Sequence, residues 1–206
     1  MPVRRILKWP SSKLRMKSSE ILNFEEAKNL AADLRDTMLA NLGVGLAAPQ
    51  VGINKRILVI DAKHLPSIKE SSHAPGVCVV VNPEISHIDE EKFSWNEACL
   101  SVDDYQASVV RNSNISLKYF DLEGQSRTIQ LHDTEAGIMQ HEADHLDGKL
   151  FIDYVSHFER RRVMKKLKRK MAEKTREKKQ SAKKHLAETK RAIARKNRKK
   201  KPKTFG

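Results

Sequence analysis

Charge is divided unevenly along this chain, and the division limits where a hydrophobic core can form. Of the 206 residues, those from Ser156 to the end include 23 Lys and Arg against 4 Glu, a net charge of +19. The preceding 155 residues carry −5, within a total of +14. Regularly spaced apolar residues thin out after Ser156. We therefore expect one mildly acidic domain of about 150 residues, followed by a basic extension.

The composition also excludes several classes of protein. No apolar run approaches the roughly 20 residues of a membrane-spanning helix, and the basic start of the chain lacks the apolar core of a signal peptide. The two cysteines, Cys78 and Cys99, provide no disulfide framework and suit a reducing compartment. We expect a cytoplasmic protein with no membrane partner, and nothing in the sequence requires more than a monomer.

Apolar periodicity predicts a helix near the start of the acidic body and buried strands after it. Asn23 is a good N-cap with Glu26 three residues on, and an apolar stripe follows it. Short apolar runs at 57–61 and 77–81 suit strands that are buried on both faces, and Pro83 is expected to end the second. Between the helix and these strands, the glycines of residues 43–52 predict a close-packed loop that allows a backbone to approach a ligand.

A hairpin and a second helix follow. Residues 115–120 and 126–131 flank the turn signature Asp-Leu-Glu-Gly. The second helix begins near Asp133 or Thr134, either of which can cap it, and Gly148 offers a stop. This order predicts an α+β fold, in which antiparallel or mixed sheets pack around the second helix and a basic C-terminal helix follows. We place the folded body at 1–155, a basic helical extension at 156–197 and a disordered basic tail at 198–206.

The second helix contains the pattern His-Glu-x-x-His, the main sign of chemistry in the chain. His141 and His145 fall one turn apart on one face, so both can bind one divalent metal, and Glu142 can act as a base toward water. A solvated helix can carry this pattern by chance, so a third ligand decides the matter. Cys99, as a thiolate, completes a Cys-His-His set with the open fourth position of a catalytic site. Cys78 is interpreted as a small buried hydrophobe.

Three segments together resemble the three motifs of the peptide deformylase family, in that family's order and approximate spacing. They are Gly-Val-Gly-Leu-Ala-Ala-Pro-Gln at 43–50, Glu-Ala-Cys-Leu-Ser at 97–101 and Gln-His-Glu-Ala-Asp-His at 140–145. The resemblance covers essentially all of residues 1–155 and none of the far tail. It implies hydrolysis of the N-formyl group from the formylmethionine of nascent polypeptides, with release of formate.

The resemblance also implies a role for each motif residue. The metal ligands are Cys99, His141 and His145. One divalent ion per chain is implied, commonly Fe²⁺ in this family, although ligand chemistry alone suggests Zn²⁺, and Ni²⁺ or Co²⁺ are further candidates. Glu142 handles the proton, while Gln50 and the backbone N–H of Leu100 stabilise charge on the formyl oxygen.

The expected substrate contacts lie beside these residues. Val44, Gly45, Gly137 and Ile138 are expected along the peptide and the methionine pocket, with Gly45 offering backbone hydrogen bonds. For Val44 and Ile138, ordinary core packing explains the residue type equally well.

One supporting ion pair and two departures from the family pattern lie beside the expected ligands. Glu97 and Arg111 are expected to pair and brace the cysteine loop. Ala98 stands where the family usually has Gly, and Asp103 stands where Pro is usual. If the glycine position requires a positive φ or a close substrate approach, Ala98 would strain or crowd the site. Because every ligand and the base remain, we expect activity to be retained.

Two alternatives stay open on the sequence. A metallopeptidase with this pattern would normally take its third ligand from a downstream residue instead of an upstream cysteine. The second alternative is an inactive deformylase-like body that is carried by an RNA-binding tail. Bacterial deformylases of this resemblance often end in a C-terminal helix that contacts the ribosome, so we expect the basic extension to bind ribosomal RNA. A merely solubilising tail is the simpler explanation of the same charge.

Overall fold

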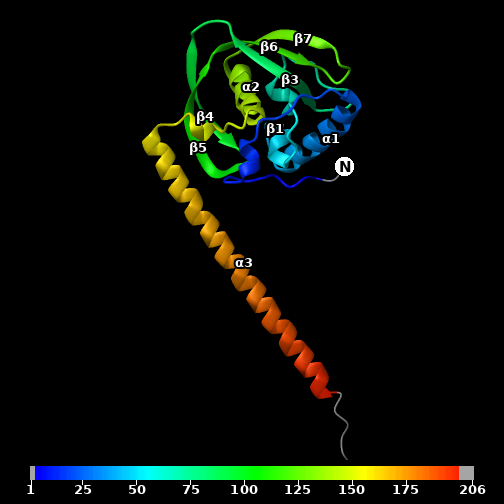
Figure 1. The fold of residues 1–206 in the computed structure, drawn as a ribbon, viewed down its shortest axis with the longest axis vertical. Coiled ribbons are helices and arrows are strands. Elements are labelled where there is room, and N and C mark those ends of the chain that lie inside the picture. Colours follow the sequence, from blue (N-terminus) through cyan, green and yellow to red (C-terminus); the bar gives the residue numbers. More distant parts are fainter. Residues whose placement is uncertain (1–2, 200–206) are drawn as a thin grey trace, which may run out of the picture. The chain divides into compact units, whose positions relative to one another are not determined.

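The computed structural model describes residues 3–199 of the chain (Figure 1). It divides into two compact units, Met1–Ser156 and His157–Gly206. The first unit is an α+β domain in which α2 (Asp133–Leu146) contacts strands of both sheets. The second is the helix α3 (His157–Lys199). Arg198 and Lys199, placed in the tail by the sequence, belong to α3, and the remaining tail residues lie outside those described.

The larger sheet has five antiparallel strands in the order β1-β2-β3-β6-β7. Their bounds are Gly45–Ala47, Ile57–Asp61, Val77–His87, Asn114–Phe120 and Ser126–His132. A smaller sheet pairs β4 (Lys92–Cys99) with β5 (Val102–Asn112). The predicted strand at 57–61 and the predicted hairpin are confirmed. The smaller sheet was not predicted, because its strands place charged residues such as Glu97 and Arg111 at buried positions.

Two apolar layers hold this unit together, one on each face of the larger sheet. The first helix, α1 (Phe24–Ala40), packs its buried stripe against the face that carries Val59. Helix α2 packs against the opposite face, which carries Leu58 and Ile60. Because successive side chains of a strand point to opposite faces and both faces are covered, β2 is buried from Ile57 to Ile60 and β3 from Val77 to Val81. This explains their continuous apolar runs and fixes α2 against the sheet.

The sequence predicted a side-chain cap at the start of each helix, and the structure has one of the two. The Asn23 side chain accepts hydrogen bonds from the backbone N–H groups of Glu25 and Glu26, so the predicted cap of α1 is confirmed. The predicted cap of α2 is wrong, because its N-cap is His132 and no side chain caps it. An N-cap requires extended backbone, whereas Asp133 has a φ of 46° and already belongs to the helix.

The predicted end of the second strand at Pro83 and the predicted loop at 43–52 are both wrong. Strand β3 continues through Pro83, because the register shifts between Val81 and Glu84 and Asn82 adopts a φ of 49°. A bulge of this kind removes the proline, which has no N–H to donate, from the regular ladder. Residues 43–52 are also more regular than a loop, since they contain β1 and the 3₁₀ helix Ala48–Val51.

Cys78 lies on β3 in the apolar layer beneath α2, as its interpretation as a buried hydrophobe predicts. Its side chain is fully buried, and its thiol lies 3.1 Å from the Ile68 carbonyl and 3.4 Å from the Leu65 carbonyl. Burial, reinforced by the negative charges of Glu70 and Asp61, raises the pKa of the thiol from 9.0 to about 11. The neutral thiol therefore ties the connection after β2 to the sheet.

Raising the pH through the alkaline range should weaken the folded state through Cys78. The folded chain holds this proton more tightly than the unfolded chain, so the stabilisation is complete below pH 9.0 and is lost as the pH rises through about 11. Cys78→Ala should flatten the alkaline part of the curve of unfolding free energy against pH, measured by urea denaturation. Parallel curves for the two proteins would contradict this prediction.

Within residues 3–199, no helix combines the length and apolar character needed to cross a membrane. Helix α3 instead presents exposed basic side chains along the part whose side chains are described. These include Arg161, Arg162, Lys165, Lys166, Lys168, Arg169, Arg176, Lys178, Lys179, Lys183 and Lys190. Its few acidic residues compensate little of this charge, as in the pair between Arg169 and Glu173 at 3.5 Å. The helix is therefore a strongly cationic surface.

Candidate metal centre

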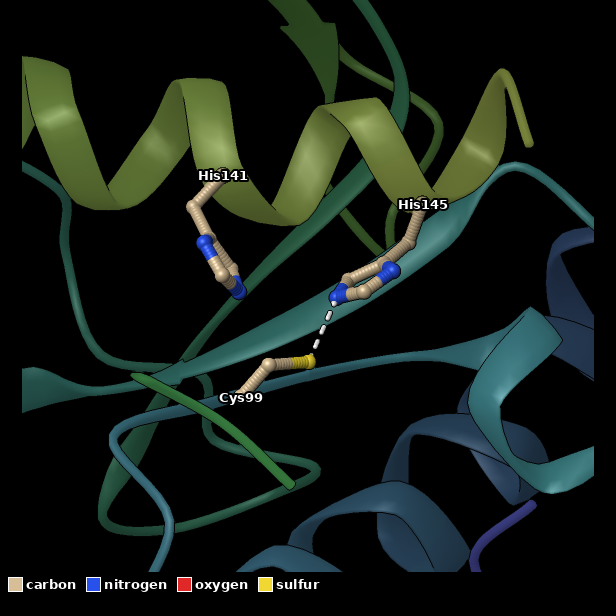
Figure 2. Close-up of side chains that lie close together, drawn as sticks. All are labelled: Cys99, His141 and His145. Atoms are coloured by element: carbon tan, nitrogen blue, oxygen red, sulfur yellow. Dashed lines mark hydrogen bonds between the residues drawn. The ribbon is translucent and has the colours of Figure 1, made fainter. Parts of the chain in front are cut away.

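The structure brings Cys99, His141 and His145 together. Cys99 ends β4, and the two histidines project from one face of α2 toward it, as Figure 2 shows. One ligand atom of each residue lies within 4.8 Å of the others, and the Cys99 Sγ is 3.3 Å from the His145 Nε2. Among the described residues, this is the one cluster of His, Cys and carboxylate groups with metal-binding geometry. Two ligands come from local helix geometry and the third comes from the smaller sheet.

A buried carboxylate orients the first histidine. Glu97 Oε2 accepts a hydrogen bond of 2.5 Å from His141 Nδ1, which leaves the Nε2 of that ring free to act as a ligand. Arg111 donates to both Glu97 oxygens, at 2.7 and 3.1 Å, as the sequence led us to expect of this pair. Arg111 also bonds Asp144, at 2.6 Å. The ion pair thus connects both sheet strands to α2.

The electrostatics of this carboxylate follow from its partners. Burial by itself raises the pKa of Glu97, but hydrogen bonds from His141 and Arg111 outweigh it and lower the pKa to about 2. Glu97 therefore remains an anion in the interior and holds the His141 Nδ1 proton in place.

The same residues fit a bound divalent cation. Burial by itself lowers the pKa of His141, yet the Cys99 sulfur and the Glu97 carboxylate outweigh it and raise the pKa well above 6.5. The site therefore stabilises positive charge. Burial, reinforced by the charge of His141, lowers the pKa of His145 well below 6.5, which keeps its ring neutral. With three borderline donors and space beside them, the set suits a catalytic transition-metal site.

Glu142 lies beside this cluster with an unsatisfied oxygen. Its side chain is buried, its Oε2 has no hydrogen-bond partner, and burial raises its pKa to about 7. The opposite wall is Gly45, where a Cβ atom would lie only 2.5 Å from Glu142 Oε1. Gly45 is therefore required for this close approach of β1 to the carboxylate. A carboxyl group with a pKa near neutrality can both accept and release a proton.

Gln50 is held so that its amide N–H₂ faces the cysteine. Its Oε1 accepts a hydrogen bond from the Ala47 backbone N–H at 2.8 Å, and its Nε2 donates to Ser101 Oγ at 3.2 Å. The same Nε2 lies 3.5 Å from Cys99 Sγ. Because the carbonyl end is already bonded, the donor end must point into the site. A neutral donor beside the metal ligands suits an oxygen that develops negative charge.

The departures from the family pattern cause no backbone strain. Ala98 is in β4, paired with Gln106, and it is absent from the described non-glycine residues with positive φ. Asp103 lies 2.7 Å from the Nζ of Lys8, which also donates to the Leu100 carbonyl at 2.6 Å. The start of the chain is thereby joined to the cysteine loop.

Two cavities meet at the cluster. One of about 370 Å³ contains Gly43, Gly45, Gln50 and Leu100 in its wall, together with polar residues. The other, of about 300 Å³, is lined by more apolar groups, including Trp95 and Ile138. Four residues line both cavities: Val44, Ala98, His141 and Glu142. His141 and Glu142 therefore stand where a bound chain would pass from one cavity into the other, while Gln50 and Leu100 line the larger cavity alone.

Gly137 lines neither cavity, unlike the other expected substrate contacts. It is buried on α2, where Phe93 and Trp95 lie over it. Sequence reasoning missed both aromatic residues, because their strand was not predicted. Their alternation with Glu97 along β4 is the signal that could have placed all three on one side of the sheet.

The comparisons with known proteins agree with this geometry. The family model for polypeptide deformylase matches residues 3–161. The chain belongs to the polypeptide deformylase family. A peptide deformylase of Bartonella tribocorum is 39% identical over 175 residues, covering 84% of this chain and 96% of the relative. One of Zymomonas mobilis is 41% identical over 168 residues, covering 81% and 94%.

Solved structures show the same fold. A peptide deformylase of Ehrlichia chaffeensis in complex with actinonin aligns with a TM-score of 0.73 at 36% identity, covering 82% of this chain and 98% of that one. A peptide deformylase of Plasmodium falciparum aligns with a TM-score of 0.71 at 33% identity, covering 82% and 96%. The protein is a metal-dependent hydrolase that acts on N-formylmethionine peptides. The interpretation as a metallopeptidase is thereby excluded.

Replacing Arg111 by Met should lower the free energy of unfolding by roughly 3–5 kcal/mol, because it removes a buried cation from Glu97 and Asp144. The matched control is Arg127→Met, which breaks a half-exposed pair with Asp121 and should cost about 0–1 kcal/mol. Urea denaturation measures both. Equal losses in the two variants would contradict the structural role of the buried pair.

Proposed function

We propose that Cys99, His141 and His145 form the metal centre at which this deformylase removes the formyl group from formylmethionine peptides, releasing formate. The observation that carries the proposal is the cluster of three donors beside Gln50 and Glu142, at which His141 and Glu142 line both cavities. When bound, a divalent metal supplies Lewis acidity that activates water and polarises a carbonyl. The donor set suits Zn²⁺, Fe²⁺, Ni²⁺ or Co²⁺, and we propose Fe²⁺ from the family resemblance.

Glu142 moves the proton in this proposal. Its carboxylate accepts a proton from the attacking water as a C–O bond forms at the formyl carbon. It then delivers that proton to the amine nitrogen as the C–N bond breaks, so formate and a free N-terminus result. The raised pKa, about 7, suits both transfers, and the buried, unpartnered Oε2 provides the position for the proton.

Gln50 and the backbone N–H of Leu100 stabilise the charge that develops on the formyl oxygen. The Gln50 donor is aimed at the site by the bond between its carbonyl and the Ala47 backbone, so little reorganisation is needed. The Lys8 Nζ donates a hydrogen bond to the Leu100 carbonyl and thereby helps to hold the residue whose N–H is proposed as a donor.

The substrate occupies both cavities. The methionine side chain enters the smaller, more apolar cavity against Val44 and Ile138. The rest of the peptide continues along the larger cavity past Gly45, whose backbone offers hydrogen bonds. Gly137 acts indirectly in this proposal, because it contributes to neither cavity wall.

Glu142→Gln tests the assignment of the base. Glutamine keeps the shape of the side chain but cannot carry the proton, so formate release from a formylmethionine peptide should fall roughly 10²–10⁴-fold. The measurement uses anaerobic, iron-loaded protein. Metal content should stay at the wild-type level in this variant and fall in Cys99→Ser, which removes a proposed ligand. Wild-type turnover by Glu142→Gln would contradict the proposal.

An inactive body is the less favoured alternative. A remnant would be free to lose donors, yet the three metal ligands, the buried carboxylate and the oriented amide are all in place. Absence of formate release by metal-loaded wild-type protein would support the remnant.

We further propose that α3 binds ribosomal RNA and holds the enzyme, acting as a monomer in the cytoplasm, near emerging peptides. The support is the row of exposed cations on the described part of the helix, with little acid to offset it. Such a surface favours a phosphate backbone as partner. The free thiolate needed at Cys99 agrees with a reducing compartment.

Replacing Arg176, Lys178, Lys179 and Lys183 by Gln should weaken this association. Fewer phosphate contacts reduce both the affinity and its dependence on salt. Co-sedimentation with ribosomes at physiological salt should fall, and deletion of residues after 171 should lower it further. Formate release from a short peptide should stay unchanged in the Gln variant, as the control. Unchanged co-sedimentation of both variants would contradict RNA binding and favour a solubilising role.

A further inference from the structure

One wall of the smaller cavity is formed by Trp95, and Phe93 stacks against this ring. Phe93 and Trp95 extend from the same side of β4, with ring centroids 6.2 Å apart and planes inclined by 29°. Trp95 lines the cavity together with Ile138 and the catalytic candidate Glu142. Its indole is therefore the largest apolar surface that an entering side chain meets.

The backbone of α2 leaves room for this ring at one residue. A Cβ atom at Gly137 would lie 2.9 Å from both Phe93 Cζ and Trp95 Cε2, which is closer than side chains tolerate. Gly137 therefore lets the aromatic pair pack directly on the helix. A larger residue at this position would occupy the space that Trp95 fills now. A large side chain at either position 95 or position 137 can therefore fill this wall of the cavity.

The position of the ring is also fixed by a hydrogen bond. The Trp95 Nε1–H donates to Glu97 Oε1 at 3.1 Å, and Glu97 is itself held by Arg111 and His141. An indole held at its nitrogen and seated on Gly137 cannot easily move aside for a larger side chain. The size of the cavity is thus set by a rigid group, in contrast to an adaptable aliphatic chain.

We propose that Trp95, seated on Gly137, is the specificity-determining residue for the first side chain of the substrate. The inference rests on the proposed function, in which methionine enters the smaller cavity. An unbranched thioether fits against an aromatic ring with a favourable sulfur contact, whereas a bulky N-terminal side chain collides with the indole. The wall selects formylmethionine over larger formylated residues.

The test compares kcat/KM for two peptides that differ only in starting with formylmethionine or formylphenylalanine. Trp95→Ala should raise the phenylalanine-to-methionine ratio roughly tenfold or more, since pocket volume commonly discriminates by factors of 10–200. Trp95→Ala combined with Gly137→Leu should return the ratio toward wild type by refilling the wall from the helix side. Trp95→Phe should give a smaller rise, because part of the ring remains.

Metal content and thermal unfolding of each variant identify protein that is not folded. If Trp95→Ala is unfolded, the milder Trp95→Phe variant carries the test, and an unchanged ratio in it overturns the inference. An unchanged ratio in folded Trp95→Ala overturns it as well. So does a double variant that keeps the ratio of Trp95→Ala. Failure of the wild-type protein to release formate from either peptide would instead refute the proposed function.

Discussion

The buried ion pair between Glu97 and Arg111 is the interaction on which the site depends. Both side chains are almost fully withdrawn from water, so each requires the other to offset the cost of desolvation. Glu97 also accepts hydrogen bonds from His141 and Trp95, and Arg111 also donates one to Asp144. The Glu97 carboxylate thereby orients a proposed metal ligand, His141, and holds Trp95 in the wall of the proposed methionine cavity.

This arrangement couples stability to chemistry. The apolar layers on the two faces of the larger sheet hold α2 in place, and α2 supplies two ligands and the proposed base. The smaller sheet supplies Cys99, Glu97 and Arg111, and the hydrogen bond from Arg111 to Asp144 joins this sheet to α2. Glu142 can then remain buried without a hydrogen-bond partner because the surrounding packing carries that cost. The result is a buried carboxyl group with a raised pKa beside the proposed metal ligands.

The two units of the chain use charge in different ways. The first unit places its polar chemistry in the interior, where low solvent access strengthens charge interactions. Helix α3 places its charge on exposed side chains, where it acts on large polyanions and is screened by salt. If α3 binds ribosomal RNA as proposed, it raises the local concentration of the enzyme near nascent peptides without changing the site.

Local sequence was sufficient for several features. Two histidines one turn apart share a helix face whatever surrounds them, Asn23 caps α1 through its own neighbouring backbone, and runs of β-branched residues form strands buried on both faces. Together with the motif around Cys99 and with Gln50, they led to the family and to a metal-dependent hydrolase. The predictions of a side-chain cap for α2, of a strand that ends at Pro83 and of a loop at 43–52 failed, because the observed backbone conformations are imposed from outside each segment.

Only the tertiary structure decided how the substrate cavity is built. The sequence pointed to Gly137 as a substrate contact, whereas the fold uses it as a gap that admits the ring of Trp95 from a distant strand. It also decided that Ala98 sits unstrained in extended backbone and that Glu142 has no hydrogen-bond partner for its Oε2. The physical reason is the same in each case. Motif residues and periodicities are properties of one segment, but burial, clearance and electrostatics arise from segments that meet only after the chain has folded.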